Sequence, residues 1–187
     1  MIRAFVAISF PESVLLSCQL LVGYLKRLEL NARFPRKEAI HLTLKFLGNI
    51  YEDQVFDIAR GLEITVQELN SFALEVRGIG VFPSLAKPKV VWAGLRDCDV
   101  LVEMQRQIEG ILEDLGFARE KRPFHPHLTL ARLRSEKNIG ALARYIEEAG
   151  PGESLGTAMV TQIHLFKSVL KSQGAEYHKL ATAKLAR

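Results

Sequence analysis

Hydrophobic and polar positions alternate along the chain in short segments. Strict alternation predicts strands, whereas apolar residues that recur every three or four positions predict helices. The expected strands cover residues 2–8, 39–46, 72–76, 89–95, 126–133, 157–169 and 175–184. The expected helices cover residues 11–29, 51–69, 98–115 and 137–149.

The order of these elements favours an α+β fold with antiparallel sheets over a parallel α/β sheet. Turns as short as Gln173-Gly174 are typical of hairpins, which join antiparallel strands. After the first strand, the order helix, motif strand, helix and strand pair occurs twice and looks like one unit used twice, with no low-complexity linker between the copies. We therefore expect residues 1–187 to form a single domain with two pseudo-symmetric lobes.

One tetrapeptide, His-Leu-Thr-Leu, occurs in two of the expected strands, at 41–44 and at 127–130. Side chains on a strand point alternately to its two faces. Around the first copy, alternation predicts an apolar core face and a polar face. The core face would hold Ile40, Leu42, Leu44 and Phe46, and the polar face His41, Thr43 and Lys45. In the second copy, His127 and Thr129 share the polar face.

The histidine and threonine of each copy lie side by side, ~6.6 to 7 Å apart along a strand, which is about the span of a phosphate with its ester oxygens. A lone histidine on a strand is more often structural than catalytic. The repetition of all four residues favours catalysis instead. Two imidazoles across a cleft can share general acid and base work, and the hydroxyls of Thr43 and Thr129 can donate to phosphoryl oxygens. The residues alone do not distinguish the acid from the base.

Charge supports an anionic substrate. The chain is 187 residues long, 48% hydrophobic, and carries a net charge of +4. Positive residues collect around both copies and in the C-terminal segment. They are Arg33, Arg36, Lys37 and Lys45 near the first copy, and Arg119, Lys121, Arg122, Arg132 and Arg134 near the second. A charge run alone is usually a solvated face, but a cleft between the two copies would attract anions.

Metal and disulfide chemistry is not indicated. Cys18 and Cys98 are isolated, without the spacing of a metal knuckle or a disulfide framework. His125 shares the face of His127, as in a metal-binding histidine pair, but no third ligand lies at suitable spacing apart from the distant His41. We therefore expect no metal and no cofactor, and assign His125 to orienting the start of the strand beside Pro126.

No apolar run approaches the ~18 to 20 residues of a membrane-spanning helix. The apolar start, residues 1–8, is too short for a signal sequence and runs directly into Pro11-Glu12. We expect a cytoplasmic protein, monomeric and without membrane contact.

Several segments together resemble one family. They are Arg3–Ile8, His41–Gly48, Pro88–Gly94 and Pro123–Arg132, and the likeness covers nearly the whole chain. The chain is similar to the two-histidine (2H) phosphoesterase superfamily, and most of all to the bacterial and archaeal RNA 2′,3′-cyclic phosphodiesterases once called 2′-5′ RNA ligases.

The resemblance implies a bilobal fold, each lobe an antiparallel sheet with outer helices, and a cleft lined by the two motif strands. It implies hydrolysis of RNA or nucleotide 2′,3′-cyclic phosphate to a 2′-phosphate, with His41 as proton donor and His127 as proton acceptor. RNA ends or cyclic nucleotides would be the partners. Ligation to a 2′-5′ linkage by the same residues, and RNA-end binding without turnover, remain alternatives.

Several other residues have candidate roles. Arg132 is the family's residue after the second motif and could hold phosphate, but alternation places it on the face of Leu128 and Leu130, so it contributes only if the strand bulges. His164 and His178 are interpreted as structural. The aromatic side chains that could stack a base are Phe46, Trp92 and Tyr177.

Overall fold

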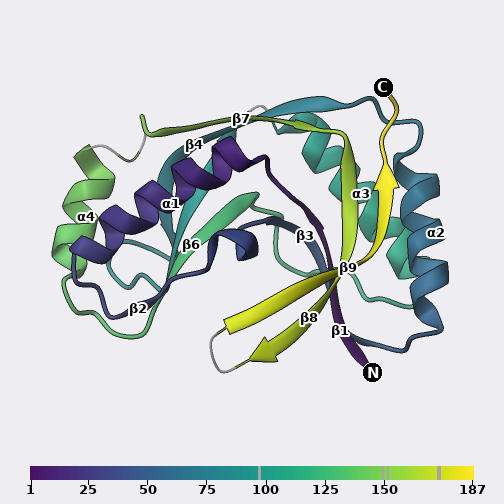
Figure 1. Cartoon of the computed structure of the whole chain (residues 1–187), viewed down its shortest axis with the longest axis horizontal. Helices are drawn as coiled ribbons and strands as arrows, with labels where there is room; N and C mark the ends of the chain where they lie inside the picture. Colours follow the sequence, from purple (N-terminus) through teal and green to yellow (C-terminus); the bar gives the residue numbers. More distant parts are fainter. Residues whose placement is uncertain (97, 149, 151, 172–173) are drawn as a thin grey trace.

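The computed structural model describes residues 1–96, 98–148, 150, 152–171 and 174–187 (Figure 1). Its strands are β1 (Ile2–Ile8), β2 (Ala32–Arg33), β3 (Leu42–Ile50), β4 (Phe72–Phe82), β5 (Val90–Arg96), β6 (His127–Leu133), β7 (Ser154–Val160), β8 (Gln162–Lys171) and β9 (Gly174–Lys184). Its α-helices are α1 (Glu12–Arg27), α2 (Gln54–Val66), α3 (Asp99–Asp114) and α4 (Ile139–Glu148), and a short 3-10 helix covers Lys37–Ala39.

All named strands belong to one sheet with the order β7-β4-β5-β6-β3-β1-β8-β9, and β2 pairs with β6. Every strand pairing in the described residues is antiparallel. The two motif strands β3 and β6 are neighbours in the middle of the sheet, where Leu42 lies opposite Leu128. The α+β class with antiparallel strands is thus confirmed.

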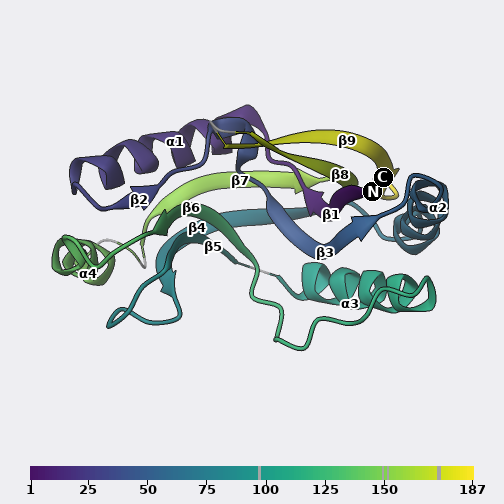
Figure 2. The same cartoon turned by 90° about the horizontal axis from the view of Figure 1, so that it is seen from below.

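Each motif strand belongs to its own half of the sheet. The His41 half consists of β3, β1, β8 and β9, and the His127 half of β7, β4, β5 and β6. Helices α2 and α3 pack on each other beside the His41 half. Helix α1 packs on β7 and β6 of the other half, and the rings of Tyr24 on α1 and Tyr145 on α4 are 4.3 Å apart. Figures 1 and 2 show the two helix pairs at opposite ends of the molecule.

The helices form where apolar spacing predicts them. In α1 the buried residues are Val14, Cys18, Leu21, Val22 and Leu25, which lie on one face of a 3.6-residue helix. Cys18 is a fully buried core residue, and this burial raises the pKa of its thiol to about 11. No helix in the described part of the chain has the length and apolar character needed to cross a membrane.

Two expected strands differ from those in the structure. The segment 157–169 is not one strand but parts of β7 and β8, which belong to different halves of the sheet. Strand β4 continues past residue 76 to Phe82, although Gly78 and Gly80 interrupt the alternation of apolar and polar residues there. A Cβ on Gly80 would lie 2.3 Å from the ring of Trp92 on the paired strand. The expected turn at Gln173 lies outside the described residues, although β8 and β9 do pair as a hairpin.

The repeated units of the sequence do not map one-to-one onto the halves. The strand pair β4–β5 follows the first motif in the sequence, yet it lies beside β6, the second motif strand. The other half is completed by β1 together with β8 and β9, so the chain crosses between the halves. Because the chain crosses in this way, both motif strands lie at the centre of one sheet.

Candidate active site

A bulge in β3 changes which side chains reach the polar face. Against β1, Thr43 pairs with Ala7 and Lys45 with Val6, so Leu44 has no partner of its own. Beyond such a bulge the alternation is reversed. Lys45 is therefore buried at 5% exposure, whereas Phe46 is 66% exposed. The predictions of a polar-face Lys45 and a core Phe46 are both wrong.

The second motif strand bulges at the corresponding position. Against β5, Thr129 pairs with Trp92 and Ala131 with Val91, which leaves Leu130 unpaired. Leu130 and Ala131 are both fully buried, and the next residue, Arg132, turns to the side of Thr129. The strand thus bulges as Arg132 requires in order to reach the same face as His127 and Thr129.

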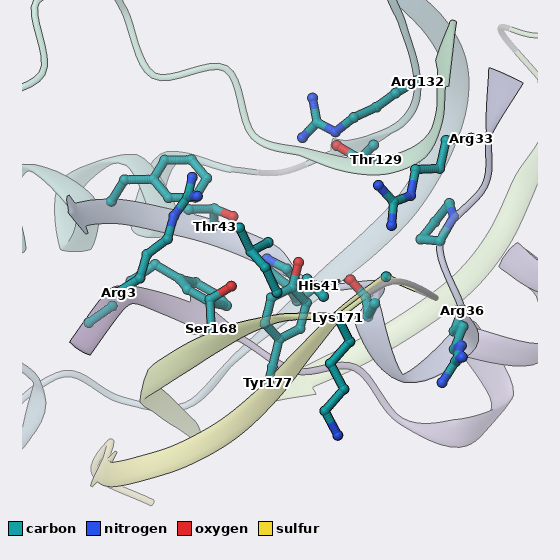
Figure 3. Close-up of a pocket in the computed structure, with 18 of the residues that line it drawn as sticks. Arg3, Arg33, Arg36, His41, Thr43, Thr129, Arg132, Ser168, Lys171 and Tyr177 are labelled. Atoms are coloured by element: carbon teal, nitrogen blue, oxygen red, sulfur yellow. Dashed lines mark hydrogen bonds between the residues drawn. The ribbon is translucent and has the colours of Figure 1, made fainter. Parts of the chain in front are cut away.

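The side chains on this face surround one cavity of about 790 Å³. Its lining includes both motif pairs, namely His41, Thr43, His127 and Thr129, together with Arg132. Figure 3 shows Thr129 and Arg132 on one wall, with Thr43, His41 and Tyr177 facing them. The structure thus brings together all five residues that the sequence indicated.

His41 lies just before β3 and is fixed through its ring. Its Nδ1 is 2.8 Å from the carbonyl oxygen of Ala39, so Nδ1–H donates and Nε2 remains for a substrate. The ring centroid lies 4.8 Å from that of Phe5 and 5.0 Å from that of Tyr177. Burial, the largest cause, and the positive charge of Arg132 lower the pKa of His41 to about 4, although the hydrogen bond to Ala39 acts in the opposite direction.

His127 begins β6 and is held in the same way. Its Nδ1 is 2.7 Å from the carbonyl oxygen of His125, and its ring meets the ring of Phe82 edge-on at 5.0 Å. Burial, followed by Arg132 and His125, lowers the pKa of His127. In both copies, the backbone two residues before the histidine therefore selects the ring nitrogen that faces the cavity.

His125 acts here through its backbone. Its side chain is exposed, 6.1 Å from the ring of Phe82 between centroids, and is not part of the cavity lining. Among the residues that the structure describes, no group of three or more His, Cys, Asp and Glu side chains is placed to hold a metal ion. Metal-independent catalysis stays a prediction.

Positive side chains surround the cavity, but they are only partly those expected. The lining cations are Arg3, Arg33, Arg36, Arg132 and Lys171. Two of the predicted cations instead pair with acids, Lys37 with Glu12 at 2.5 Å and Arg119 with Glu113 at 2.7 Å. Arg3 was missed, although it is the one exposed residue within β1 and the one charged residue of that apolar segment.

The structure distinguishes among the three aromatic residues that were candidates for stacking a base. Phe46 and Tyr177 line the cavity, whereas Trp92 does not and instead covers Gly80. His164 is buried, with Nδ1 2.9 Å from the hydroxyl oxygen of Thr182, which fits the structural interpretation. His178 is exposed and lies 3.9 Å from Glu176, so it is not a core residue.

Comparison with known proteins agrees with this geometry. The family model of the 2′-5′ RNA ligase superfamily matches residues 19–171. A protein of Aeropyrum pernix named RNA 2′,3′-cyclic phosphodiesterase is 37% identical over 80% of this chain and 84% of its own length. A protein of the same name from Methanothermobacter thermautotrophicus is 29% identical over 98% of this chain and 99% of its own.

Solved structures show the same fold. A Thermus thermophilus protein superposes with a TM-score of 0.82 at 24% identity, covering 98% of this chain and 97% of its own. Escherichia coli LigT without ligand superposes with a TM-score of 0.80 at 24% identity, covering 100% of this chain and 98% of its own. By sequence and by fold, this chain belongs to the 2′-5′ RNA ligase superfamily.

Proposed function

We propose that the protein hydrolyses the 2′,3′-cyclic phosphate of an RNA end or nucleotide and leaves a 2′-phosphate. The observation that carries the proposal is the pair His41 and His127 in one cation-lined cavity, each oriented by a backbone carbonyl and each followed by a threonine on the same face. Relatives named RNA 2′,3′-cyclic phosphodiesterase support it.

Each residue has a defined role in this reaction. His127 removes a proton from water through Nε2, and the water oxygen attacks phosphorus in line. His41 donates a proton to the leaving 3′ oxygen as the ring P–O bond breaks. The hydroxyls of Thr43 and Thr129 and the guanidinium of Arg132 donate to the phosphoryl oxygens, where negative charge grows in the transition state. The reaction consumes one water and regenerates both histidines after one proton exchange with solvent.

His41 takes up the proton that it donates from solvent, and substrate binding favours that uptake. Burial and Arg132 hold the pKa of both histidines below the ordinary value, so both rings are neutral in the empty cavity at neutral pH. A bound phosphate anion offsets the charge of Arg132 and favours the imidazolium beside it. Substrate binding and protonation of His41 are therefore coupled.

Ligation is the second candidate, because the matching family takes its name from 2′-5′ RNA ligation. An RNA 5′-hydroxyl in the place of water would use the same residues and give a 2′-5′ linkage. Binding without turnover is less favoured, since Arg3, Arg33 and Arg132 alone would serve to hold a phosphate.

Turnover of a 2′,3′-cyclic mononucleotide by the purified protein tests the proposal. The products are separated against 2′- and 3′-monophosphate standards, with and without excess EDTA, and with a 5′-hydroxyl oligonucleotide added to detect ligation. We expect the 2′-phosphate at a rate that EDTA does not change. A 3′-phosphate product would mean that the ribose binds in the reverse direction. Loss of turnover on chelation, restored by a divalent ion, would show that a metal takes part.

A further inference from the structure

A buried ion pair lies behind the first motif strand, outside the cavity. Nζ of Lys45 is 2.5 Å from Oε2 of Glu109 on α3, and the two side chains are 3% and 9% exposed. The same Nζ donates to the carbonyl oxygen of Ala118 at 2.8 Å. None of these residues lines the cavity.

Hydrogen bonds extend this pair in two directions. The carboxylate of Glu109 accepts from Nε2 of Gln105 at 3.2 Å and from the backbone N–H of Glu120 at 3.2 Å. Nε2 of Gln105 also donates, at 3.3 Å, to the carbonyl oxygen of Leu44. Leu44 is the residue that the β3 bulge leaves without a partner, so the network stabilises the bulge itself.

The network joins both motif strands. At one end it holds Leu44 and Lys45, which directly follow Thr43. At the other end it holds Ala118 and Glu120, in the segment that runs from α3 to His127 at the start of β6. Besides the pairing of Leu42 with Leu128, the network therefore ties the first motif strand to the loop that leads into the second.

The other half of the sheet shows that a bulge does not require a charge. Ala131 occupies the position in β6 that Lys45 occupies in β3, and it is fully buried without any polar group on its side chain. Burying two charges costs solvation, and a buried ion pair can often be replaced by apolar residues without loss of stability. We therefore look for the role of the Lys45–Glu109 pair in the backbone position that it fixes, not in a gain of stability.

We propose that Lys45 and Glu109 are positioning residues that set the placement of the His41 strand relative to the His127 strand. This inference rests on the proposed function, because the quantity that the pair controls is the geometry of two histidines acting on one phosphate. A misplacement of about 1 Å in such a site can cost about 100-fold in rate.

The test replaces the whole pair in Lys45→Met/Glu109→Met, so that no lone charge is left buried. A matched control, Glu103→Met/Arg106→Met, removes an exposed ion pair of 2.7 Å from the same helix. Thermal melts establish that each variant is folded, and kcat and KM are measured with a 2′,3′-cyclic nucleotide. We expect kcat of the Lys45 and Glu109 variant to fall by about 10- to 100-fold with KM within about twofold of wild type, and the control to match wild type.

A folded variant with wild-type kcat would overturn the proposal. If the double variant does not fold, Lys45→Gln/Glu109→Gln decides instead, since it too leaves no buried charge and retains hydrogen-bonding atoms at both positions. A smaller loss in kcat at unchanged KM is expected, and wild-type kcat would again contradict the proposal. NMR titration of the two ring systems gives a readout that needs no turnover, because His127 is one of the groups that lower the pKa of His41. Changed titration curves in the variant would support the positioning role, and unchanged curves would contradict it. An inactive wild-type protein would count against the proposed function alone, because the titration needs no turnover.

Discussion

His41 and His127 share one hydrogen-bond arrangement but lie in different surroundings. The ring of His41 forms a cluster with the rings of Phe5 and Tyr177, in which each pair of centroids is no more than 5.0 Å apart, whereas the ring of His127 makes a T-shaped contact with Phe82. Burial is the largest cause of the lowered pKa in both histidines, and the positive charge of Arg132 comes after it. Loss of solvation, more than the cations around the motifs, is therefore the reason that both rings favour the neutral form.

Removing either histidine should remove half of a proton-transfer pair. We expect His41→Ala and His127→Ala each to lower kcat by ~10²- to 10⁴-fold while the fold persists, and the double variant to lose less than the product of the two effects. Thr43→Ala and Thr129→Ala should cost less, since each removes one donor to the transition state. Steady-state kinetics on variants with native circular dichroism would show this, and full activity in a single histidine variant would rule out the mechanism.

The pH dependence should reflect the lowered pKa values. Catalysis needs one protonated and one neutral ring, and in the free enzyme that state gains population as the pH falls below the ordinary histidine pKa of about 6.5. We expect the pH profile of kcat/KM to be bell-shaped, with its maximum below pH ~6.5. The pH profile of kcat should be a bell at higher pH, because bound phosphate raises the pKa of His41. Both profiles are obtained by initial rates at constant ionic strength. A kcat/KM maximum well above neutrality would contradict the assigned burial effect.

At the scale of the elements, the matching bulges in β3 and β6 explain what the sequence could and could not predict. Alternation correctly placed His41, Thr43, His127 and Thr129 on one face, because all four lie before the bulges. It failed for Lys45 and Phe46 and left Arg132 undecided, because these residues lie beyond the bulges. A bulge depends on the register of the partner strand, and the local sequence pattern does not contain that register. The same limit left Tyr177 as one of three aromatic candidates, since it approaches the cavity through the long-range pairing of β1 with β8 and of β8 with β9.

Arg132 offers a direct test of what the second bulge achieves. A guanidinium that donates charge-assisted hydrogen bonds to phosphate contributes about 1.5 to 3 kcal/mol, so Arg132→Ala should lower kcat/KM by about 10- to 150-fold. Arg132→Lys keeps the charge but loses the two-pronged geometry and should recover only part of this loss. The control is Arg134→Ala, two residues further and outside the cavity lining. Equal effects at the two positions would show that only general charge matters.

At the scale of the whole molecule, the cavity lies across the junction of the two sheet halves, and its cations come from separate elements. Arg3 lies on β1, Arg33 on β2, Arg132 on β6 and Lys171 at the end of β8. In Figure 3, Arg3 and Arg36 lie on opposite sides of His41. Positive charge therefore extends beyond the space that one cyclic phosphate would occupy, which suits a chain of phosphates better than a single nucleotide.

This arrangement predicts a preference for RNA ends that depends on salt. An oligonucleotide ending in a 2′,3′-cyclic phosphate should have a lower KM than the matching mononucleotide, because its additional phosphates release counterions on meeting Arg3 or Arg33. The advantage should shrink as salt rises, and Arg33→Ala should reduce it for the oligonucleotide while changing mononucleotide turnover little. Arg144→Ala, on the exposed face of α4 and outside the cavity lining, serves as the charge-matched control. The measurement is KM for both substrates across a range of salt concentrations. Equal salt slopes for the two substrates, or equal effects of the two arginine variants, would show that only the terminal phosphate is bound and that the surrounding cations act as a solvated surface.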